Sequence, residues 1–173
     1  LAALTGTTMA RTNPAAFYDA NVTGTINMLE AARHNGVQHF FFSSSSAVYA
    51  DAASSPLKEE DHVDTPLNMY GASKRSAELL CYSYAKAYGM PVTVFRLFTV
   101  FGPWARPDSI PMQLAHRIMK GAEIRVLNNG YIVRDFTYID DIMEKINMDA
   151  IRNAHLRIVL DPMYGVGQTA IST

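Results

Sequence analysis

Cysteine is almost absent from this sequence, since Cys81 is the only one in 173 residues. A single thiol excludes an internal disulfide and a metal site built from several thiolates. It also favours a reducing compartment, so we expect a cytoplasmic protein. The five histidines show no ligand spacing such as a pair four residues apart, and no metal is therefore expected.

Long apolar runs and an excess of one charge are missing as well. No stretch approaches the ~20 apolar residues of a membrane-spanning helix, and 15 Lys and Arg residues nearly balance 16 Asp and Glu residues. We therefore expect neither a membrane nor a nucleic-acid partner. What is present is an apolar content of 49%, which is typical of a globular domain with a packed core.

Helical and strand-like segments alternate along the chain. Asn13 and Pro14 are typical of a helix start. The residues from Ala15 to Arg33 predict a helix, which Gly36 would end in a left-handed conformation.

Two apolar runs flank a second predicted helix. His39 to Ser43 and Val92 to Phe98 are typical of strands buried on both faces of a parallel sheet. Met69 to Tyr88 predicts the crossover helix of a βαβ unit between them. We therefore expect an α/β fold with a doubly wound parallel sheet. The remaining predicted elements are a helix near Ile110 to Lys120 and strands at Ile124 to Leu127, Ile132 to Thr137 and Leu156 to Leu160.

Polar side chains occur where such a sheet places its chemistry. Ser43 to Ser46 follow the first predicted strand at its carboxyl end, the end at which open α/β sheets bind ligands. Tyr70 and Lys74 are four residues apart and share one face of the next helix. An ammonium one turn away favours the phenolate of a tyrosine, whose pKa is ordinarily near ~10. The phenolate could then take a proton from a substrate hydroxyl that a serine orients.

The Tyr-x-x-x-Lys spacing is not specific by itself, because Tyr82 and Lys86 repeat it. Tyr82 lies roughly 18 Å further along the helix at ~1.5 Å per residue and is turned by about 120°. It cannot face the same serines, and we interpret it as an ordinary packing residue.

Five motifs succeed one another over residues 1–142. They are Asn21-Val-Thr-Gly-Thr25, Ser43-Ser-Ser-Ser-Ala-Val-Tyr49, Tyr70-Gly-Ala-Ser-Lys74, Arg96-Leu-Phe-Thr-Val-Phe-Gly-Pro103 and Arg134-Asp-Phe-Thr-Tyr-Ile-Asp-Asp141. In this order they resemble the NAD-dependent epimerase/dehydratase family of extended short-chain dehydrogenases. The resemblance implies a Rossmann-like fold, NAD as cofactor and a UDP-sugar as substrate. By position, it implies catalysis by Ser45, Tyr70 and Lys74, cofactor binding by Asn21, Ser43, Tyr70, Lys74 and Phe98, and substrate binding by Ser44, Thr99, Arg106 and Arg134.

Two features narrow the reaction that the resemblance implies. Dehydratases of the family carry Asp-Glu where this sequence has Ser46 and Ala47, and Ala47 supplies neither acid nor base for an elimination. The segment from Arg96 to Asp108 is similar to that of UDP-glucuronate 4-epimerases. Hydride abstraction at sugar C4, a keto intermediate and hydride return are therefore implied. A reductase or dehydratase, or an inactive fragment or interaction module with the same fold, remains an alternative.

The resemblance is incomplete at both ends. No Gly-rich turn precedes Asn13, so we expect a partial sheet that lacks the N-terminal half, and weak or no NAD binding by this polypeptide alone. Residues 143–173 instead resemble a strand-loop-helix segment of phosphohexomutases. This divides the sequence into an epimerase-like part, 1–142, and a tail of different resemblance. In the family, helices equivalent to 15–33 and 69–88 form a homodimer, and such a dimer is possible here.

Overall fold

The computed structural model describes residues 3–49, 56–124, 131 and 135–145. The described residues fall into two compact units, the first ending at Leu97 and the second beginning at Phe98. Each unit contains helices and a pair of parallel strands, which confirms the expected α/β class.

A series of helical segments opens the first unit. They are α1 (Thr7–Thr12), α2 (Pro14–Tyr18), the π-helical turn η1 (Asp19–Thr23) and α3 (Gly24–His34). Asn13 caps α2 as expected, because its side chain accepts a hydrogen bond from the backbone N–H of Ala16 at 3.3 Å. Gly36 follows α3 with φ 61, the left-handed conformation that the sequence predicts. The helix predicted at 15–33 is therefore present, but a π-helical turn interrupts it.

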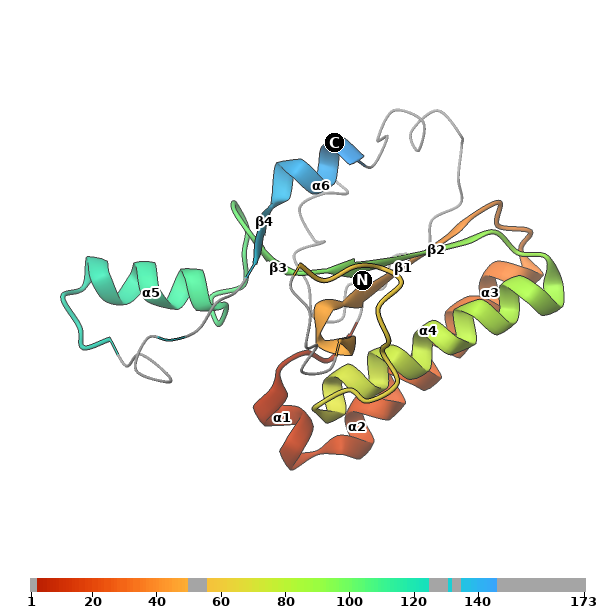
Figure 1. The fold of residues 1–173 in the computed structure, drawn as a ribbon, viewed down its shortest axis with the longest axis horizontal. Helices are drawn as coiled ribbons and strands as arrows, with labels where there is room; N and C mark the ends of the chain where they lie inside the picture. The colour runs from red at the N-terminus through yellow and green to blue at the C-terminus, as the bar shows by residue number, and fades with distance from the viewer. Residues whose placement is uncertain (1–2, 50–55, 125–130, 132–134, 146–173) are drawn as a thin grey trace. The chain divides into compact units, whose positions relative to one another are not determined.

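The predicted βαβ unit forms the centre of the first unit. β1 (Phe40–Ser45) and β2 (Val92–Leu97) pair in parallel, and α4 (Met69–Tyr88) connects them with the limits predicted from the sequence. Gly89 ends α4 in a left-handed conformation with φ 64. In Figure 1, α3 and α4 lie side by side on one face of this strand pair.

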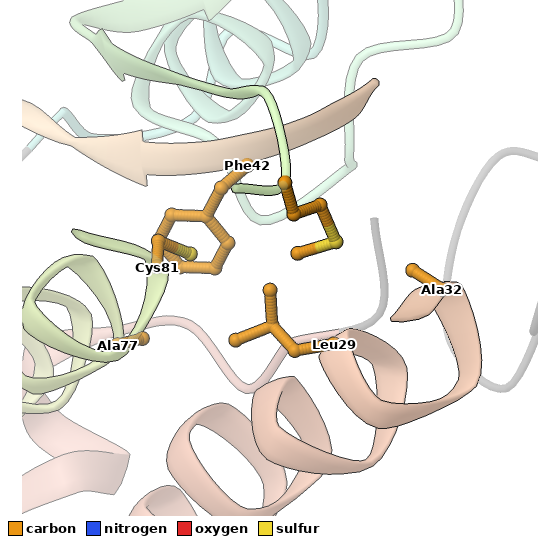
Figure 2. Close-up of a cluster of buried hydrophobic side chains, with 6 residues drawn as sticks. Leu29, Ala32, Phe42, Ala77 and Cys81 are labelled. Atoms are coloured by element: carbon orange, nitrogen blue, oxygen red, sulfur yellow. The ribbon is translucent and has the colours of Figure 1, made fainter. Parts of the chain in front are cut away.

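The core of the first unit lies between the strand pair and these two helices. Figure 2 shows its main cluster, whose labelled members are Phe42 of β1, Leu29 and Ala32 of α3, and Ala77 and Cys81 of α4. Leu29, Ala77 and Cys81 are completely buried, and burial raises the pKa of the Cys81 thiol to about 12. Full burial of one leucine-sized side chain contributes ~1.5–3 kcal/mol to the free energy of folding. This layer therefore holds α4, and with it Tyr70 and Lys74, against the sheet.

The other face of β1 differs from the prediction. Phe41 is 52% exposed, and its ring stacks with those of His39 and Phe95 at centroid distances of 4.4 and 5.9 Å. The prediction that this strand is buried on both faces is therefore wrong for Phe41. Successive side chains of a strand point to opposite faces, so a run of three phenylalanines places one ring on the outer face whatever covers that face.

The second unit has its own parallel strand pair. Its elements are β3 (Thr99–Phe101), α5 (Ile110–Met119), β4 (Phe136–Tyr138) and α6 (Ile139–Lys145), with β3 pairing with β4. The strand predicted to end at Phe98 ends instead at Leu97, and β3 begins after Phe98. Gly102 has φ 133, and a Cβ there would lie 2.7 Å from Cγ2 of Ile139. Glycine at this position therefore allows the loop after β3 to approach α6.

Several predictions fall outside the described residues. These are most of the strand at 124–127, the first part of the strand at 132–137, the strand at 156–160 and the tail from residue 146 onward. Helix α6 runs through the predicted boundary at residue 142. In the described ranges, no helix is long and apolar enough to cross a membrane, and no cluster of histidine, cysteine and acidic side chains is arranged to hold a metal ion.

Candidate active site

The serine run ends β1 and begins the next turn. Ser45 is the last residue of β1 and the N-cap of a short 3-10 helix, η2 (Ser46–Val48), where its Oγ accepts a hydrogen bond from Ala47 N at 3.2 Å. A serine hydroxyl that accepts such a bond still has its own proton to donate. Residues 45–49 are called the serine turn below.

Helix α4 begins directly against the serine turn. The side chain of Asn68 caps it by accepting a hydrogen bond from Gly71 N at 2.8 Å. Gly71 packs so closely on Ala47 that an added Cβ would lie 2.1 Å from the Ala47 carbonyl oxygen. Tyr70 precedes this contact and meets the ring of Phe17 edge-on at 6.4 Å. The structure therefore brings the first turn of α4, which carries Tyr70, to the serine turn at the carboxyl end of β1.

Lys74 lies one helical turn after Tyr70 and is only 5% exposed. Its Nζ donates a hydrogen bond to the backbone carbonyl of Ser43 at 3.0 Å and lies 5.1 Å from the centre of the Phe42 ring. Burial lowers the pKa of Lys74 to about 8, because the interior disfavours an ammonium that has lost its hydration. The bond to Ser43 uses one of three N–H donors, so the ammonium has donors for a further polar group.

Ser44 faces the interior of the unit. Ser44 is 4% exposed, and its hydroxyl donates a hydrogen bond to Oε1 of Glu78 on α4 at 2.5 Å. In this structure the Ser44 hydroxyl therefore contacts the protein, and its expected contact with substrate stays a prediction.

Asn21 lies in the π-helical turn and is 2% exposed. Its amide bonds the backbone N–H and carbonyl of Leu4 at 2.9 and 3.0 Å and donates to Oγ of Ser73 at 3.0 Å. Ser73 in turn donates to the carbonyl of Tyr70 at 2.8 Å. Asn21 thus supports the first turn of α4 through hydrogen bonds, while its expected contact with the cofactor stays a prediction.

Three of the remaining expected site residues, Phe98, Thr99 and Arg106, belong to the second unit. Phe98 and Thr99 are half-buried, and Thr99 begins β3. Arg106 directs its guanidinium at Asp108, with Nε–Oδ1 and Nη2–Oδ2 distances of 2.9 and 2.5 Å, and this pairing lowers the pKa of Asp108. Arg134 lies outside the described residues. The roles of these residues stay predictions.

The second tyrosine–lysine pair lies elsewhere on the helix surface. Tyr82 is 63% exposed, and Nζ of Lys86 lies 5.7 Å from the centre of its ring. Tyr82 thus packs on Lys86 at the surface and not in the core. The two pairs have the same spacing but different environments.

Sequence reasoning missed three residues of the site, Asn68, Gly71 and Glu78. Asn68 stands just before a helical pattern, which is the usual signal of an N-cap. Gly71 stands inside a predicted helix, where glycine is unfavourable by ~1 kcal/mol and points to a packing reason. Glu78 follows Lys74 by four residues, and no local pattern distinguishes it from a solvated helix carboxylate.

A parallel βαβ unit whose crossover helix sets a tyrosine and a buried lysine against serines at a strand end defines a Rossmann-like α/β protein of the short-chain dehydrogenase type. The chain belongs to the NAD dependent epimerase/dehydratase family, which matches residues 1–154. The family expected from the motifs is confirmed.

Two curated relatives match most of this chain in sequence. The chain is 42% identical over 146 residues to a probable UDP-glucuronate 4-epimerase of Rhizobium meliloti, and 43% identical over 142 residues to a UDP-glucuronate 4-epimerase of Thermodesulfobacterium geofontis. The matches cover 84% and 82% of this chain but 43% and 44% of the relatives. The chain therefore spans less than half the length of these relatives.

A solved structure shows the same likeness. It is the UDP-glucuronic acid 4-epimerase from Bacillus cereus in complex with UDP-glucuronic acid and NAD, which is 31% identical and superposes with a TM-score of 0.77. The match covers 91% of this chain and 47% of that one. The expected Rossmann-like fold is thereby confirmed.

Proposed function

We propose that this chain carries the catalytic centre of an NAD-dependent nucleotide-sugar 4-epimerase that acts on UDP-glucuronate. The observation that carries the proposal is the close packing of Gly71 on Ala47, because it sets the first turn of α4 against the serine turn. The turn that Ser45 begins and the helix that carries Tyr70 and Lys74 therefore meet at one end of the strand pair, as proton transfer to and from a sugar hydroxyl requires.

The residues at this end of the sheet fit a nicotinamide cofactor. Lys74 is a buried ammonium with donors for hydroxyl groups such as those of a ribose, and Ser43 lies beside it. The positions of their motifs in the sequence support Asn21 and Phe98 as further cofactor contacts. Asn21, which is 2% exposed, would have to release Leu4 or Ser73 to make such a contact. When bound, NAD supplies the acceptor for a hydride from the sugar carbon and returns that hydride.

The proton chemistry comes from the chain's own side chains. Tyr70 would take the proton of the C4 hydroxyl, because the ammonium of Lys74 one turn away favours the phenolate. Ser45 would donate a hydrogen bond to the same sugar oxygen and orient it. Tyr70 would give the proton back when the 4-keto sugar is reduced on its other face, so the sugar leaves as the 4-epimer and the protein is unchanged.

The substrate class is supported by the relatives named UDP-glucuronate 4-epimerases. Ala47 offers no acid or base for removing water, which favours epimerisation over dehydration. We assign Thr99 to the sugar carboxylate and Arg106 and Arg134 to the diphosphate, because a guanidinium fork matches phosphate oxygens. Arg106 would exchange Asp108 for those oxygens on binding.

The test is conversion of UDP-glucuronate into its 4-epimer by the chain with added NAD, followed by liquid chromatography. Turnover of UDP-glucuronate is expected to exceed that of UDP-glucose by at least ~10-fold. The polar groups that bind the carboxylate of glucuronate would lose that partner when glucose presents a hydroxymethyl group instead. Equal turnover of both sugars would overturn the substrate assignment. Because weak NAD binding is expected of this polypeptide alone, NAD is raised until calorimetry shows that it is bound. Absence of turnover with both sugars at that NAD concentration would overturn the assignment as an enzyme and favour an inactive module.

We also propose that two copies of the chain associate through the helices at 15–33 and 69–88. Their surface carries exposed apolar side chains, with Met28 37%, Leu79 51% and Tyr82 63% exposed. Sedimentation velocity should show a dimer, and Leu79→Asp should shift it to monomer because a buried, unpaired carboxylate is costly. A wild-type chain that stays monomeric as its concentration is raised would contradict this.

A further inference from the structure

A buried carboxylate that the proposed chemistry does not use lies beside the serine turn. Glu78 is 4% exposed and stands on α4 one turn after Lys74. Its oxygens accept four hydrogen bonds: from the Ser44 hydroxyl at 2.5 Å, from Nε and Nη2 of Arg96 at 3.1 and 3.0 Å, and from Nη1 of Arg75 at 3.1 Å. Four donors match the roughly four lone-pair sites of a carboxylate. Such full pairing is what a buried charge needs to be tolerated.

Arg96 extends this network to the far end of the serine turn. In the parallel register it lies opposite Ser44. Its Nη1 donates to the Tyr49 hydroxyl at 3.3 Å and to the carbonyl of Glu59 at 3.0 Å, and its guanidinium carbon lies 5.2 Å from the centre of the Tyr49 ring. Hydrogen bonding to Glu78 holds the pKa of Arg96 above its usual value. Glu78 is therefore connected to both ends of the turn, Ser44 just before it and Tyr49 at its end.

Helix α4 holds two consecutive residues of β1 in the same way. Lys74 binds the carbonyl of Ser43, and Glu78 binds the hydroxyl of Ser44. The next residue along the strand is Ser45. Because Lys74 and Glu78 stand on the helix that also carries Tyr70, these two bonds tie the end of β1 to that helix.

We propose that Glu78 is a positioning residue: by holding Ser44 and, through Arg96, Tyr49, it determines where the Ser45 hydroxyl lies relative to Tyr70. Ser44 then acts through Glu78 and does not touch the sugar, which replaces the substrate contact that the resemblance implies for it. The effect of Glu78 on catalysis rests on the proposed function. Its hydrogen bonds to Ser44 and Arg96, called the Glu78 clamp below, restrain the serine turn, and this restraint can be measured without any substrate.

The Glu78 clamp is tested by measuring amide hydrogen exchange in the 173-residue chain by mass spectrometry. Glu78→Gln keeps the shape of the side chain but removes the charge between two guanidinium groups, so amides in residues 44–49 should exchange at least ~10-fold faster. Glu30→Gln is the matched control. Glu30 also accepts Nε and Nη2 of one arginine, Arg33, at 3.1 and 2.8 Å, but it lies on α3 and is half-exposed. This control should leave residues 44–49 unchanged.

Ser44→Ala is the milder variant, because it removes one hydrogen bond and leaves the pairing of Glu78 with both arginines in place. It should also speed exchange in residues 44–49, by less than Glu78→Gln. With UDP-glucuronate and NAD, both variants should lower kcat and leave KM within about twofold, since a positioning residue acts on the reacting geometry and not on uniform substrate binding.

Two results would overturn the inference. One is unchanged exchange in residues 44–49 of a folded Glu78→Gln chain. The other is a Ser44→Ala variant with a raised KM and an unchanged kcat, which would mean that Ser44 contacts the sugar. If the wild-type chain turns over no UDP-sugar, the catalytic role of Glu78 falls with the proposed function, and the exchange data still decide whether Glu78 holds the serine turn.

Discussion

Tyr70→Phe is expected to lower kcat on UDP-glucuronate by about 10²–10⁴-fold, because it removes the group that carries the proton to and from the C4 hydroxyl. KM should change little, since the ring stays in place against Phe17. The free energy of unfolding should fall by no more than ~1.5 kcal/mol, the contribution of one hydrogen bond. The measurement is steady-state epimerisation beside urea unfolding of the same preparation.

Tyr82→Phe is the matched control for this substitution. Tyr82 stands on the same helix, has the same four-residue spacing to a lysine and is 63% exposed. Its loss of a hydroxyl should leave kcat unchanged. An equal loss of kcat in the two variants, or a Tyr70→Phe chain with wild-type kcat, would show that Tyr70 does not carry the proton.

Gly71→Ala is expected to destabilise the chain by roughly 1–3 kcal/mol, the usual cost of forcing extra volume into a packed site. The new Cβ would lie 2.1 Å from a backbone oxygen, that of Ala47, and 3.3 Å from Cβ of Pro66. Backbone cannot rotate away as a flexible side chain can, so either α4 or the serine turn must move. Epimerisation should therefore fall together with the free energy of unfolding, which urea titration measures.

Gly24→Ala separates this clash from the general effect of replacing a helical glycine. Gly24 begins α3, and an added Cβ would meet only the carbonyl oxygen of Asp19, at 3.9 Å. Alanine favours helix over glycine by ~1 kcal/mol, so this variant should be as stable as the wild type or more stable. A Gly71→Ala chain that gains stability as Gly24→Ala does would show that α4 does not pack on the serine turn as described.

Local signals predicted most of the secondary structure of the first unit. The C-terminal limit of α4 agrees with the sequence because Gly89 and Pro91 act on the residues next to them. The cap at Asn13 is as local, since its side chain bonds an amide three residues away. The sequence does not predict the π-helical turn at Asp19–Thr23. This turn carries the buried Asn21, whose side chain bonds Leu4 and Ser73, and these lie 17 and 52 residues away in the sequence.

By itself, the sequence determined the family, the order of strand, helix and strand, and the placement of Tyr70 and Lys74 on one helix. These depend on ordered motifs and on the 3.6-residue period, both of which are visible in a linear chain. Only the tertiary structure shows that Gly71 packs on Ala47, that the Ser44 hydroxyl donates a hydrogen bond to Glu78, and that Phe41 lies on an exposed face. Each of these depends on which distant segments meet and how closely they approach, and packing across the fold decides that, not local spacing.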